Sequence, residues 1–167
     1  VEAARGTTRE VPFRVAVAQW VRACGQQPLV RVNAPDSSFF AEDCAALAHL
    51  ALGGLVVPKV NDAGDLAPLH ASWPGIGLFP LIETATGLEN APSIARAAGV
   101  RQLLLGALDL HAECGIDFPN PGLMEYARLR LVLASRMHAI EPPIDSPHPS
   151  LHQLDEVSED ARAAATL

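Results

Sequence analysis

The chain has 167 residues, 49% of them hydrophobic, which is enough for a single globular unit with a sizeable core over residues 1–167. Its 12 Lys and Arg against 19 Asp and Glu give a formal net charge of -7, and no basic run offers a track for a phosphate backbone, so we expect no nucleic-acid partner. The apolar stretches fall short of the roughly 20 residues that a bilayer span requires, so we expect no membrane segment either.

Short runs rich in Val, Ile and Leu recur along the chain and have the length of strands. Because they are nearly continuous in apolar residues, we predict strands that are buried on both faces of a parallel sheet. The runs cover residues 29–33, 54–60, 77–84, 102–110 and 140–145. Segments with helical spacing lie between them, at residues 39–52, 87–99 and 123–139.

Strand, helix and strand in repetition predict an α/β fold with right-handed crossovers. Both an open doubly wound sheet and a barrel satisfy this pattern. A complete (β/α)8 TIM barrel takes about 250 residues, roughly 31 per unit, so this chain would hold about five of the eight βα units. A partial barrel would leave two strands with unpaired edges, which a partner or further residues of the protein would have to cover.

The ends of the chain and its cysteines indicate its context. The chain begins at Val1 without an initiator methionine and ends in a helical pattern at residues 158–167 with no stop signal, which predicts a piece of a longer protein. Its three cysteines are too few for a disulfide framework, so we expect small buried thiols and a cytoplasmic location.

Polar residues finish each predicted strand, where parallel α/β folds place their ligands. A single one of them is equally well explained as a helix cap, because Asp, Asn, Ser and Thr are common at strand-to-helix junctions. A series of them favours a binding site, in which Asn33 and Thr84 are candidate substrate-binding residues. The strand-end residues are Arg31 and Asn33, Lys59, Glu83 and Thr84, Asp109, and Asp145.

Arg31 is unusual because it lies inside an apolar strand. Strand alternation places it on one face with Leu29 and Asn33. A buried cation needs an anionic partner or ligand, since leaving it unpaired costs several kcal/mol. Two readings are open: Arg31 binds the substrate, or it forms a structural ion pair with Glu83 or Asp109.

Glu83 and Asp109 are about one β-α-β crossover apart. If their strands are neighbours, about 4.8 Å apart, both carboxylates leave the sheet at the same end and could share a divalent ion. Mg²⁺ suits such a site, because it takes one or two carboxylates and completes its shell with water and substrate oxygens. The alternative is an acid/base pair that shares one proton. The strand ends carry no cysteine or histidine, so zinc is disfavoured.

Other residues are assigned to packing. The helix predicted at 123–139 carries Leu123, Ala127, Leu131 and Ala134 on one stripe, which is typical of the inner face of a surface helix. Trp20 and Trp73 lie away from the strand ends, so we expect both to pack against the core. His111, just after Asp109, is compatible with the rim of a pocket or with solvent.

Six motifs at these positions, in this order, resemble the citrate lyase beta-subunit and malyl-CoA lyase family within the HpcH/HpaI aldolase superfamily. The resemblance runs from about residue 14 to the end. The motifs are RVN at 31–33, VVPKV at 56–60, IETATG at 82–87 followed by ENAPSIA, GALDL at 106–110 with Gly115 after it, MEYARLRLVLASR at 124–136, and PPIDSP at 142–147.

The resemblance implies a (β/α)8 barrel that uses Mg²⁺ to cleave or form a carbon-carbon bond between an acyl-CoA thioester and a 2-oxo acid. It also implies a role for each matching residue. Glu83 and Asp109 match the family's metal ligands, Arg31 the arginine that stabilises the enolate, Gly106, Ala107 and Leu108 the turn whose amides hold the keto-acid carboxylate, and Lys59 the lysine of the PK motif.

The resemblance further implies a homo-oligomer, a trimer or hexamer, or a lyase complex. Family members carry an acidic motif before the point where this chain starts, and Gly-Lys and Ile-His-Pro segments after Leu167, so the resemblance does not assign the general base to a residue of this chain. The leading expectation is a lyase that cleaves a 3-hydroxyacyl-CoA such as citryl-, malyl- or citramalyl-CoA. The alternatives are a CoA-independent class II 2-oxo acid aldolase and a non-catalytic ligand-binding subunit.

Overall fold

The computed structural model describes residues 10–148 and 154–165, in which strands and helices alternate. In chain order they are α1 (Glu10–Ala23), β1 (Leu29–Arg31), α2 (Phe40–Leu47), β2 (Gly54–Val57), the 3-10 helix η1 (Ala63–Asp65), α3 (Ala67–Ser72), β3 (Leu78–Ile82), α4 (Ala85–Glu89), α5 (Ala91–Ala95), β4 (Gln102–Leu105), α6 (Ala107–Cys114), α7 (Pro121–Met137), β5 (Glu141–Ile144) and α8 (Leu154–Ala164).

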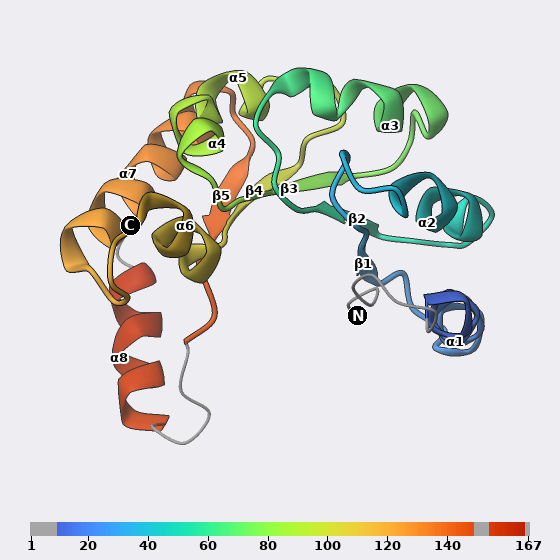
Figure 1. The fold of residues 1–167 in the computed structure, drawn as a ribbon, viewed down its shortest axis with the longest axis horizontal. Coiled ribbons are helices and arrows are strands. Elements are labelled where there is room, and N and C mark those ends of the chain that lie inside the picture. The colour runs from blue at the N-terminus through green and yellow to red at the C-terminus, as the bar shows by residue number, and fades with distance from the viewer. Residues whose placement is uncertain (1–9, 149–153, 166–167) are drawn as a thin grey trace.

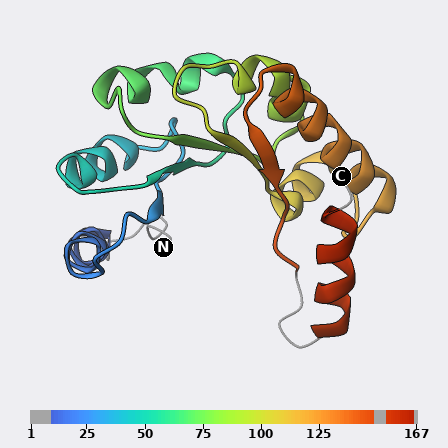
Figure 2. The ribbon, with the colours of Figure 1, turned by 180° about the vertical axis from the view of Figure 1, so that it is seen from behind.

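All the strands are parallel and follow one another in the order β1-β2-β3-β4-β5, which confirms the predicted parallel sheet. The chain forms an arch, with α2, α3, α5 and α7 along its outer side and with α1 and α8 at its two feet (Figure 1). The view from behind shows the strands lining the inner side (Figure 2). Consecutive strand order with the helices on one side is the arrangement of a βα barrel.

The two faces of the sheet differ in burial. In β3, Leu78, Pro80 and Ile82 are buried under the helices, whereas Phe79 and Leu81, on the alternate face, are only half-buried. The other central strands alternate in the same way. In the residues described, the helices cover the outer face and the core lies between it and them. Complete burial of the inner face stays a prediction.

The helix α7 follows its sequence signals closely. Asn120 caps its start, where the side-chain oxygen accepts the N–H of Leu123 at 3.0 Å, and Pro121 occupies the first helical position. Ala127, Leu131 and Ala134 are buried, as the predicted stripe requires. This stripe packs α7 onto the outer side of β4 and β5.

The sequence predicts a single strand at residues 102–110, but the structure has a strand and the start of a helix there. The strand β4 ends at Leu105, and the helix α6 begins at Ala107 after Gly106 as its N-cap. A short apolar run does not distinguish a strand from the first turn of a buried helix, which explains the error. Asp109 therefore lies in the first turn of a helix and not at a strand end.

The strand β5 contains Pro142 and Pro143, which lack the N–H that a sheet ladder uses. Among the described residues β5 pairs with β4 alone, and its pairing is irregular between Gln102 and Leu104. The side-chain amide of Gln102 donates to the carbonyl of Pro142 at 2.6 Å. This contact supplements the irregular backbone pairing between the two strands.

Two expectations about packing residues need correction. Trp20 is 47% exposed on α1, so it does not pack into the core, whereas Trp73 does pack against it. The three cysteines are free, as predicted, but half-buried instead of buried. Burial and the neighbouring charge of Asp43 raise the pKa of Cys44 to about 11, so this thiol is protonated at neutral pH.

Candidate metal and substrate site

Glu83 directly follows β3 and is almost completely buried, with 3% of its surface exposed. Its position in the strand alternation points it to the inner side of the arch, the side away from the helices. The backbone N–H of Lys59 donates to Glu83 Oε1 at 3.1 Å. The carboxylate is thus fixed from the end of the neighbouring strand β2, and Oε2 is left for another contact.

Gly106, at the end of β4, lies directly against this glutamate. A Cβ placed on residue 106 would be 2.6 Å from Glu83 Cβ and 2.8 Å from Glu83 Oε2, distances that real atoms do not tolerate. The glycine N–H donates to the carbonyl of Ile82 at 2.9 Å, so the backbone is held at this close approach. Glycine is required here for space, since its φ of -105° is open to any residue.

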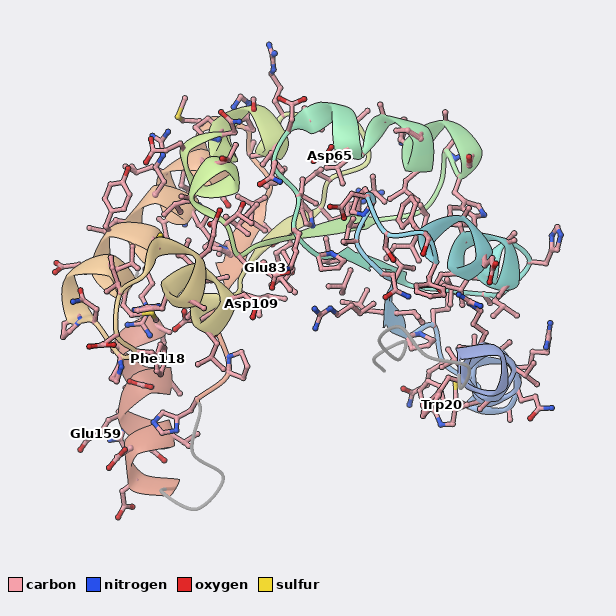
Figure 3. All side chains as sticks on the ribbon, in the orientation of Figure 1. Trp20, Asp65, Glu83, Asp109, Phe118 and Glu159 are labelled. Carbon is pink, nitrogen blue, oxygen red and sulfur yellow. The ribbon has the colours of Figure 1, made fainter. Side chains whose placement is uncertain are left out.

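Asp109 comes close to Glu83 from the first turn of α6 (Figure 3). The alternative that Asp109 is a helix cap is not observed, because Gly106 is the N-cap of α6 and makes no side-chain capping bond. Asp109 is half-buried. The structure therefore brings together the two carboxylates that the sequence singles out.

The electrostatics of the pair favour a cation between them. Burial raises the pKa of Glu83 above the usual glutamate range, and the negative charge of Asp109 raises it further. The positive charges of Arg31 and Lys59, and the Lys59 N–H bond, lower the same pKa. A cation bound between the carboxylates would remove the repulsion that makes ionisation of Glu83 costly.

The donor set fits magnesium. The described residues contain no cluster of three or more His, Cys, Asp or Glu side chains that could hold a metal ion. Mg²⁺ needs no such cluster, because it commonly uses one or two carboxylates and keeps water or substrate oxygens as its other ligands. Glu83 and Asp109 are the side chains that would hold it.

Arg31 ends β1 on the inner face of the sheet and is half-buried. In the register of the sheet it pairs with Val56, and Val56 in turn pairs with Phe79 of β3. Its charge lowers the pKa of Glu83, so the guanidinium and the carboxylate interact across the inner face. Both the ion pair with Glu83 and substrate binding by Arg31 are compatible with this position, and substrate binding stays a prediction.

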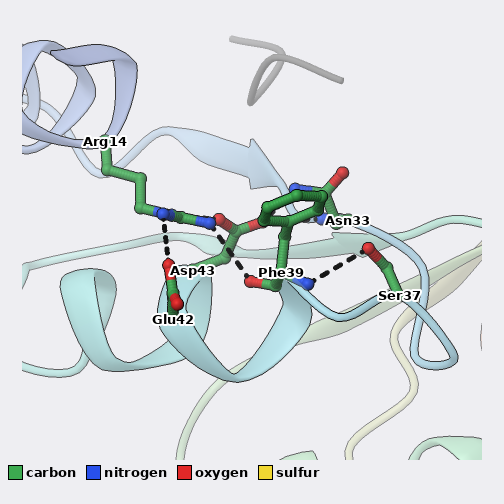
Figure 4. A network of polar contacts seen from close by, with 6 residues as sticks. All are labelled: Arg14, Asn33, Ser37, Phe39, Glu42 and Asp43. Carbon is green, nitrogen blue, oxygen red and sulfur yellow. Dashed lines mark hydrogen bonds and ion pairs between the residues drawn. The ribbon is translucent and has the colours of Figure 1, made fainter. Parts of the chain in front are cut away.

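Asn33 has a different environment from the one expected. Its backbone N–H and its side-chain amide both donate to Asp43 Oδ2, at 2.9 and 2.6 Å, and the other oxygen of Asp43 accepts from Arg14 Nε at 2.7 Å (Figure 4). Asp43 is 3% exposed. Asn33 therefore connects the end of β1 to α2 and α1, and substrate binding by Asn33 stays a prediction.

Lys59 lies in a turn after β2 with a φ of 54°, a left-handed conformation that is uncommon for lysine. The turn directs the backbone N–H to Glu83 and leaves the side chain exposed. The part of Lys59 that contacts the site is thus its backbone. The role predicted for its side chain stays a prediction.

Thr84 caps the helix α4. Its hydroxyl accepts the N–H of Gly87 at 3.0 Å and donates to the side-chain oxygen of Asn61. One residue later, the N–H of Ala85 donates to Glu113 Oε2 at 2.5 Å, from one turn beyond Asp109 on α6. The sequence reasoning missed Asn61 and Glu113, because neither follows a strand directly. Substrate binding by Thr84 stays a prediction.

The backbone turn at the start of α6 places Ala107 and Leu108 at a helix N-terminus, which attracts anions. The N–H of Ala107 donates to Ser146 Oγ at 3.2 Å. Ser146 follows β5 and was missed, although it lies next to Asp145 at a predicted strand end. Asp145 itself forms a bidentate ion pair with Arg128 Nε and Nη2, so it belongs to the scaffold.

The sequence matches the profile of the HpcH/HpaI aldolase/citrate lyase family over residues 2–167. The chain belongs to this family. The predicted resemblance is thus confirmed, and the arch of parallel strands is part of the (β/α)8 barrel on which the family is built. No helix among the described residues is long and apolar enough to cross a bilayer.

Individual relatives agree with this assignment. A (3S)-malyl-CoA thioesterase of Cereibacter sphaeroides is 34% identical over 113 residues, which cover 67% of this chain and 40% of the relative. RipC of Yersinia pestis has a TM-score of 0.87 at 25% identity, with 99% of this chain and 77% of RipC covered. CitE of Mycobacterium tuberculosis, in complex with magnesium, acetoacetate and coenzyme A, has a TM-score of 0.82 at 25% identity, covering 99% and 62%.

Two further facts come from these comparisons. This chain spans less than half the length of the malyl-CoA thioesterase that it matches. In CitE, magnesium is bound together with acetoacetate and coenzyme A.

Proposed function

We propose that this chain forms part of a magnesium-dependent carbon-carbon lyase that cleaves a 3-hydroxyacyl-CoA into an acyl-CoA and a 2-oxo acid. The observation that carries the proposal is the pair of carboxylates, Glu83 and Asp109, on the inner side of the arch next to the charge of Arg31. Membership of a lyase and aldolase family supports it. The magnesium and coenzyme A found together in CitE support the choice of cofactor and substrate class.

In this proposal the two carboxylates hold the metal ion, and the positively charged Arg31 contacts the substrate. When bound by Glu83 and Asp109, magnesium supplies a Lewis acid for the hydroxyl and carboxylate oxygens of the substrate. The hydroxyl of the substrate gives its proton to a base and becomes the carbonyl of the 2-oxo acid as the carbon-carbon bond breaks. The electrons of that bond move to the thioester, and Arg31 stabilises the resulting enolate oxygen by charge-assisted hydrogen bonds. The enolate then takes a proton to give the acyl-CoA. The amides at the start of α6 bind the carboxylate of the 2-oxo acid.

The metal site is tested first, by isothermal titration of Mg²⁺ into the wild-type chain and into Glu83→Ala and Asp109→Ala. We expect each substitution to weaken binding by at least about tenfold, since each removes one of two anionic ligands. Asp117→Asn, which changes an exposed carboxylate beyond the end of α6, is the control and should bind as the wild type does. Unchanged affinity in both alanine variants would contradict the assignment of the site.

The reaction is tested by following products from malyl-, citramalyl- and citryl-CoA, with magnesium and with EDTA. A lyase releases an acyl-CoA and a 2-oxo acid in equal amounts. Cleavage of the corresponding hydroxy acids without coenzyme A would instead indicate a class II aldolase, and binding without turnover a ligand-binding subunit. Because this chain spans part of its relatives, the assay uses the longest natural protein that contains it.

The 34% identity to a (3S)-malyl-CoA thioesterase favours a second candidate, the hydrolysis of the thioester bond. In that reaction water attacks the thioester carbon, and coenzyme A leaves as the free thiol with malate as the acid product. The two activities differ in their products, because only the thioesterase releases free thiol stoichiometrically. A thiol reagent together with a 2-oxo acid assay therefore distinguishes them in a single experiment.

Three wider features are proposed with this function. We propose that residues 1–167 act as one structural unit, which the continuous core of the described residues supports. We also propose a homo-oligomer, a trimer or a hexamer, or a lyase complex, which sedimentation analysis tests. A cytoplasmic location stays a prediction, which cell fractionation checks.

A further inference from the structure

His111, two residues after Asp109 on α6, is buried, with 1% of its surface exposed. It therefore lies neither at the rim of a pocket nor in solvent, the two positions that are compatible with the sequence. Its ring packs edge-on against Phe118, at a distance of 4.9 Å between the ring centroids (Figure 3). A polar ring that is buried to this extent needs a partner for each nitrogen, and the structure supplies both.

The two partners of the ring define which nitrogen carries the proton. The backbone N–H of Asn120 donates to Nε2 at 3.2 Å, so Nε2 is an acceptor without a proton. The proton is then on Nδ1, which donates to the carbonyl of Ala107 at 2.7 Å. Because Asn120 is the N-cap of α7, the ring connects the first turn of α6 to the start of the long helix that packs on the sheet.

The carbonyl of Ala107 belongs to the same peptide group as the N–H of Leu108. A trans peptide is planar, and its C=O and N–H point in opposite directions. A hydrogen bond that holds the carbonyl therefore fixes the direction of the N–H, and it polarises the group so that the N–H is a stronger donor. This N–H points towards the start of α6, where Gly106 lies against Glu83.

The neighbouring amides of this turn already have acceptors. The N–H of Gly106 donates to the carbonyl of Ile82 at 2.9 Å, and the N–H of Ala107 donates to Ser146 Oγ at 3.2 Å. The first N–H groups of a helix have no acceptor within the helix. Among the described residues, none accepts from the N–H of Leu108. Leu108 therefore carries an amide that a carboxylate can bind without displacing another contact.

We propose that His111 is a positioning residue for the carboxylate of the 2-oxo acid, because it holds the 107–108 peptide with the N–H of Leu108 directed at the ligand. This role rests on the proposed function, which places that carboxylate at the start of α6. Leu108 then replaces Gly106 and Ala107 as the donor in this turn. The imidazole itself does not touch the substrate and acts through the peptide group.

Two substitutions separate the two hydrogen bonds of the ring. Asparagine has an amide nitrogen at the position of Nδ1, so His111→Asn keeps the donor to Ala107 and loses the contact with Asn120. Glutamine places an oxygen near the position of Nε2, so His111→Gln keeps the contact with Asn120 and loses the donor. The measurement is calorimetric titration of glyoxylate, pyruvate and oxaloacetate into the magnesium-loaded form of the longest natural protein that contains this chain.

We expect His111→Gln to bind the 2-oxo acids about 3-fold to 10-fold more weakly than the wild type, which is the effect of one neutral hydrogen bond. His111→Asn should recover the wild-type affinity. Both variants should keep the wild-type affinity for Mg²⁺, because neither changes Glu83 or Asp109. His49→Gln, at an exposed histidine after α2, is the control and should bind as the wild type does.

A second variant removes the amide itself and leaves the buried ring in place. Leu108→Pro lacks the N–H, and proline is accepted in the first turn of a helix. It should also bind the 2-oxo acids about 3-fold to 10-fold more weakly. When His111→Gln is added to Leu108→Pro, we expect no further loss, because both substitutions act on the same hydrogen bond.

Thermal unfolding distinguishes this role from a purely structural one. His111→Asn and His111→Gln each lose one hydrogen bond of a buried ring, so both should unfold at lower temperature, whereas only His111→Gln should lose affinity for the 2-oxo acids. Equal affinities in the two variants, or additive losses with Leu108→Pro, would overturn the positioning role while the proposed function stands. A wild-type protein that binds magnesium but none of the three 2-oxo acids would overturn the proposed function, and the role of His111 with it.

Discussion

Gly106 and Glu83 are packed so closely that residue 106 can carry no side chain while the glutamate keeps its position. Gly106→Ala should therefore displace the carboxylate and weaken Mg²⁺ binding by roughly 10-fold to 100-fold, the range found when the support of a metal ligand is lost. The clash should also destabilise the fold by about 1–3 kcal/mol. Isothermal titration and urea unfolding measure the two effects. Gly75→Ala is the control, because a Cβ on Gly75 meets no atom within 4 Å.

The raised pKa of Glu83 predicts how stability depends on pH. Burial and Asp109 favour the protonated form in the folded chain, so in the range above the usual glutamate pKa the folded state binds more protons than the unfolded state. The free energy of unfolding should then fall as the pH rises through this range in metal-free buffer. Glu83→Gln cannot ionise at this position, so its free energy of unfolding should fall less over the same pH range. Urea unfolding across the pH range, with EDTA, measures the difference, and parallel curves for the two proteins would contradict it.

Magnesium should reverse this trend. The ion binds the ionised carboxylate, so its affinity should rise with pH over the same range, and binding should release protons. Adding Mg²⁺ should stabilise the wild type more at neutral than at acidic pH. Calorimetric titration in buffers of different ionisation enthalpy counts the protons released.

Asp43 should contribute far more to stability than its neighbour Glu42, although both pair with Arg14. Asp43 is 3% exposed and accepts from Arg14 and twice from Asn33, whereas the Glu42 side chain is 65% exposed. Asp43→Ala should cost about 3–5 kcal/mol, because it removes the buried anion that both Arg14 and Asn33 contact. Glu42→Ala should cost about 0–1 kcal/mol. Urea unfolding of both variants checks this, and equal effects would contradict the role given to Asp43.

Glu113 should act on the metal site through the position of α6. It lies one turn after Asp109, and its carboxylate accepts the N–H of Ala85, which directly follows Thr84. Glu113→Ala should release this link and weaken Mg²⁺ binding roughly 10-fold, whereas Glu113→Gln keeps an acceptor oxygen and should bind almost as the wild type. Isothermal titration of Mg²⁺ into the two variants measures the difference in affinity. Equal loss in both variants would indicate that the charge matters, not the link.

The sequence predicted the elements whose signals are local. Val-, Ile- and Leu-rich runs located every strand, and the apolar spacing of α7 predicted the face that it buries. The helix α6 was missed because Gly106 interrupts an apolar run without changing its hydrophobicity, so the start of a helix resembled the end of a strand. An apolar run does not show which face a neighbouring element covers, so the difference in burial between the outer and inner faces was not predicted.

The site was predicted in part for the same reason. Glu83, Asp109 and Arg31 stand out as charged residues within or beside apolar runs. Asn61, Glu113 and Ser146 act through contacts that cross between elements, and such contacts depend on the fold. The restriction on Gly106 is also invisible in the sequence, since it comes from the side chain of a residue on the adjacent strand.

The alternation of the sheet has a consequence for how such a protein can evolve. Its outward residues, such as Leu55, Leu78 and Ile82, form the core, while the inward positions beside Arg31 and Glu83 contribute little to it. Among the described strands, selection for folding therefore acts mainly on the outward residues, and selection for ligand binding on the inward positions beside Arg31 and Glu83. A single scaffold can in this way acquire new substrate preferences in small steps, while the selection that preserves its folding acts on a separate set of residues.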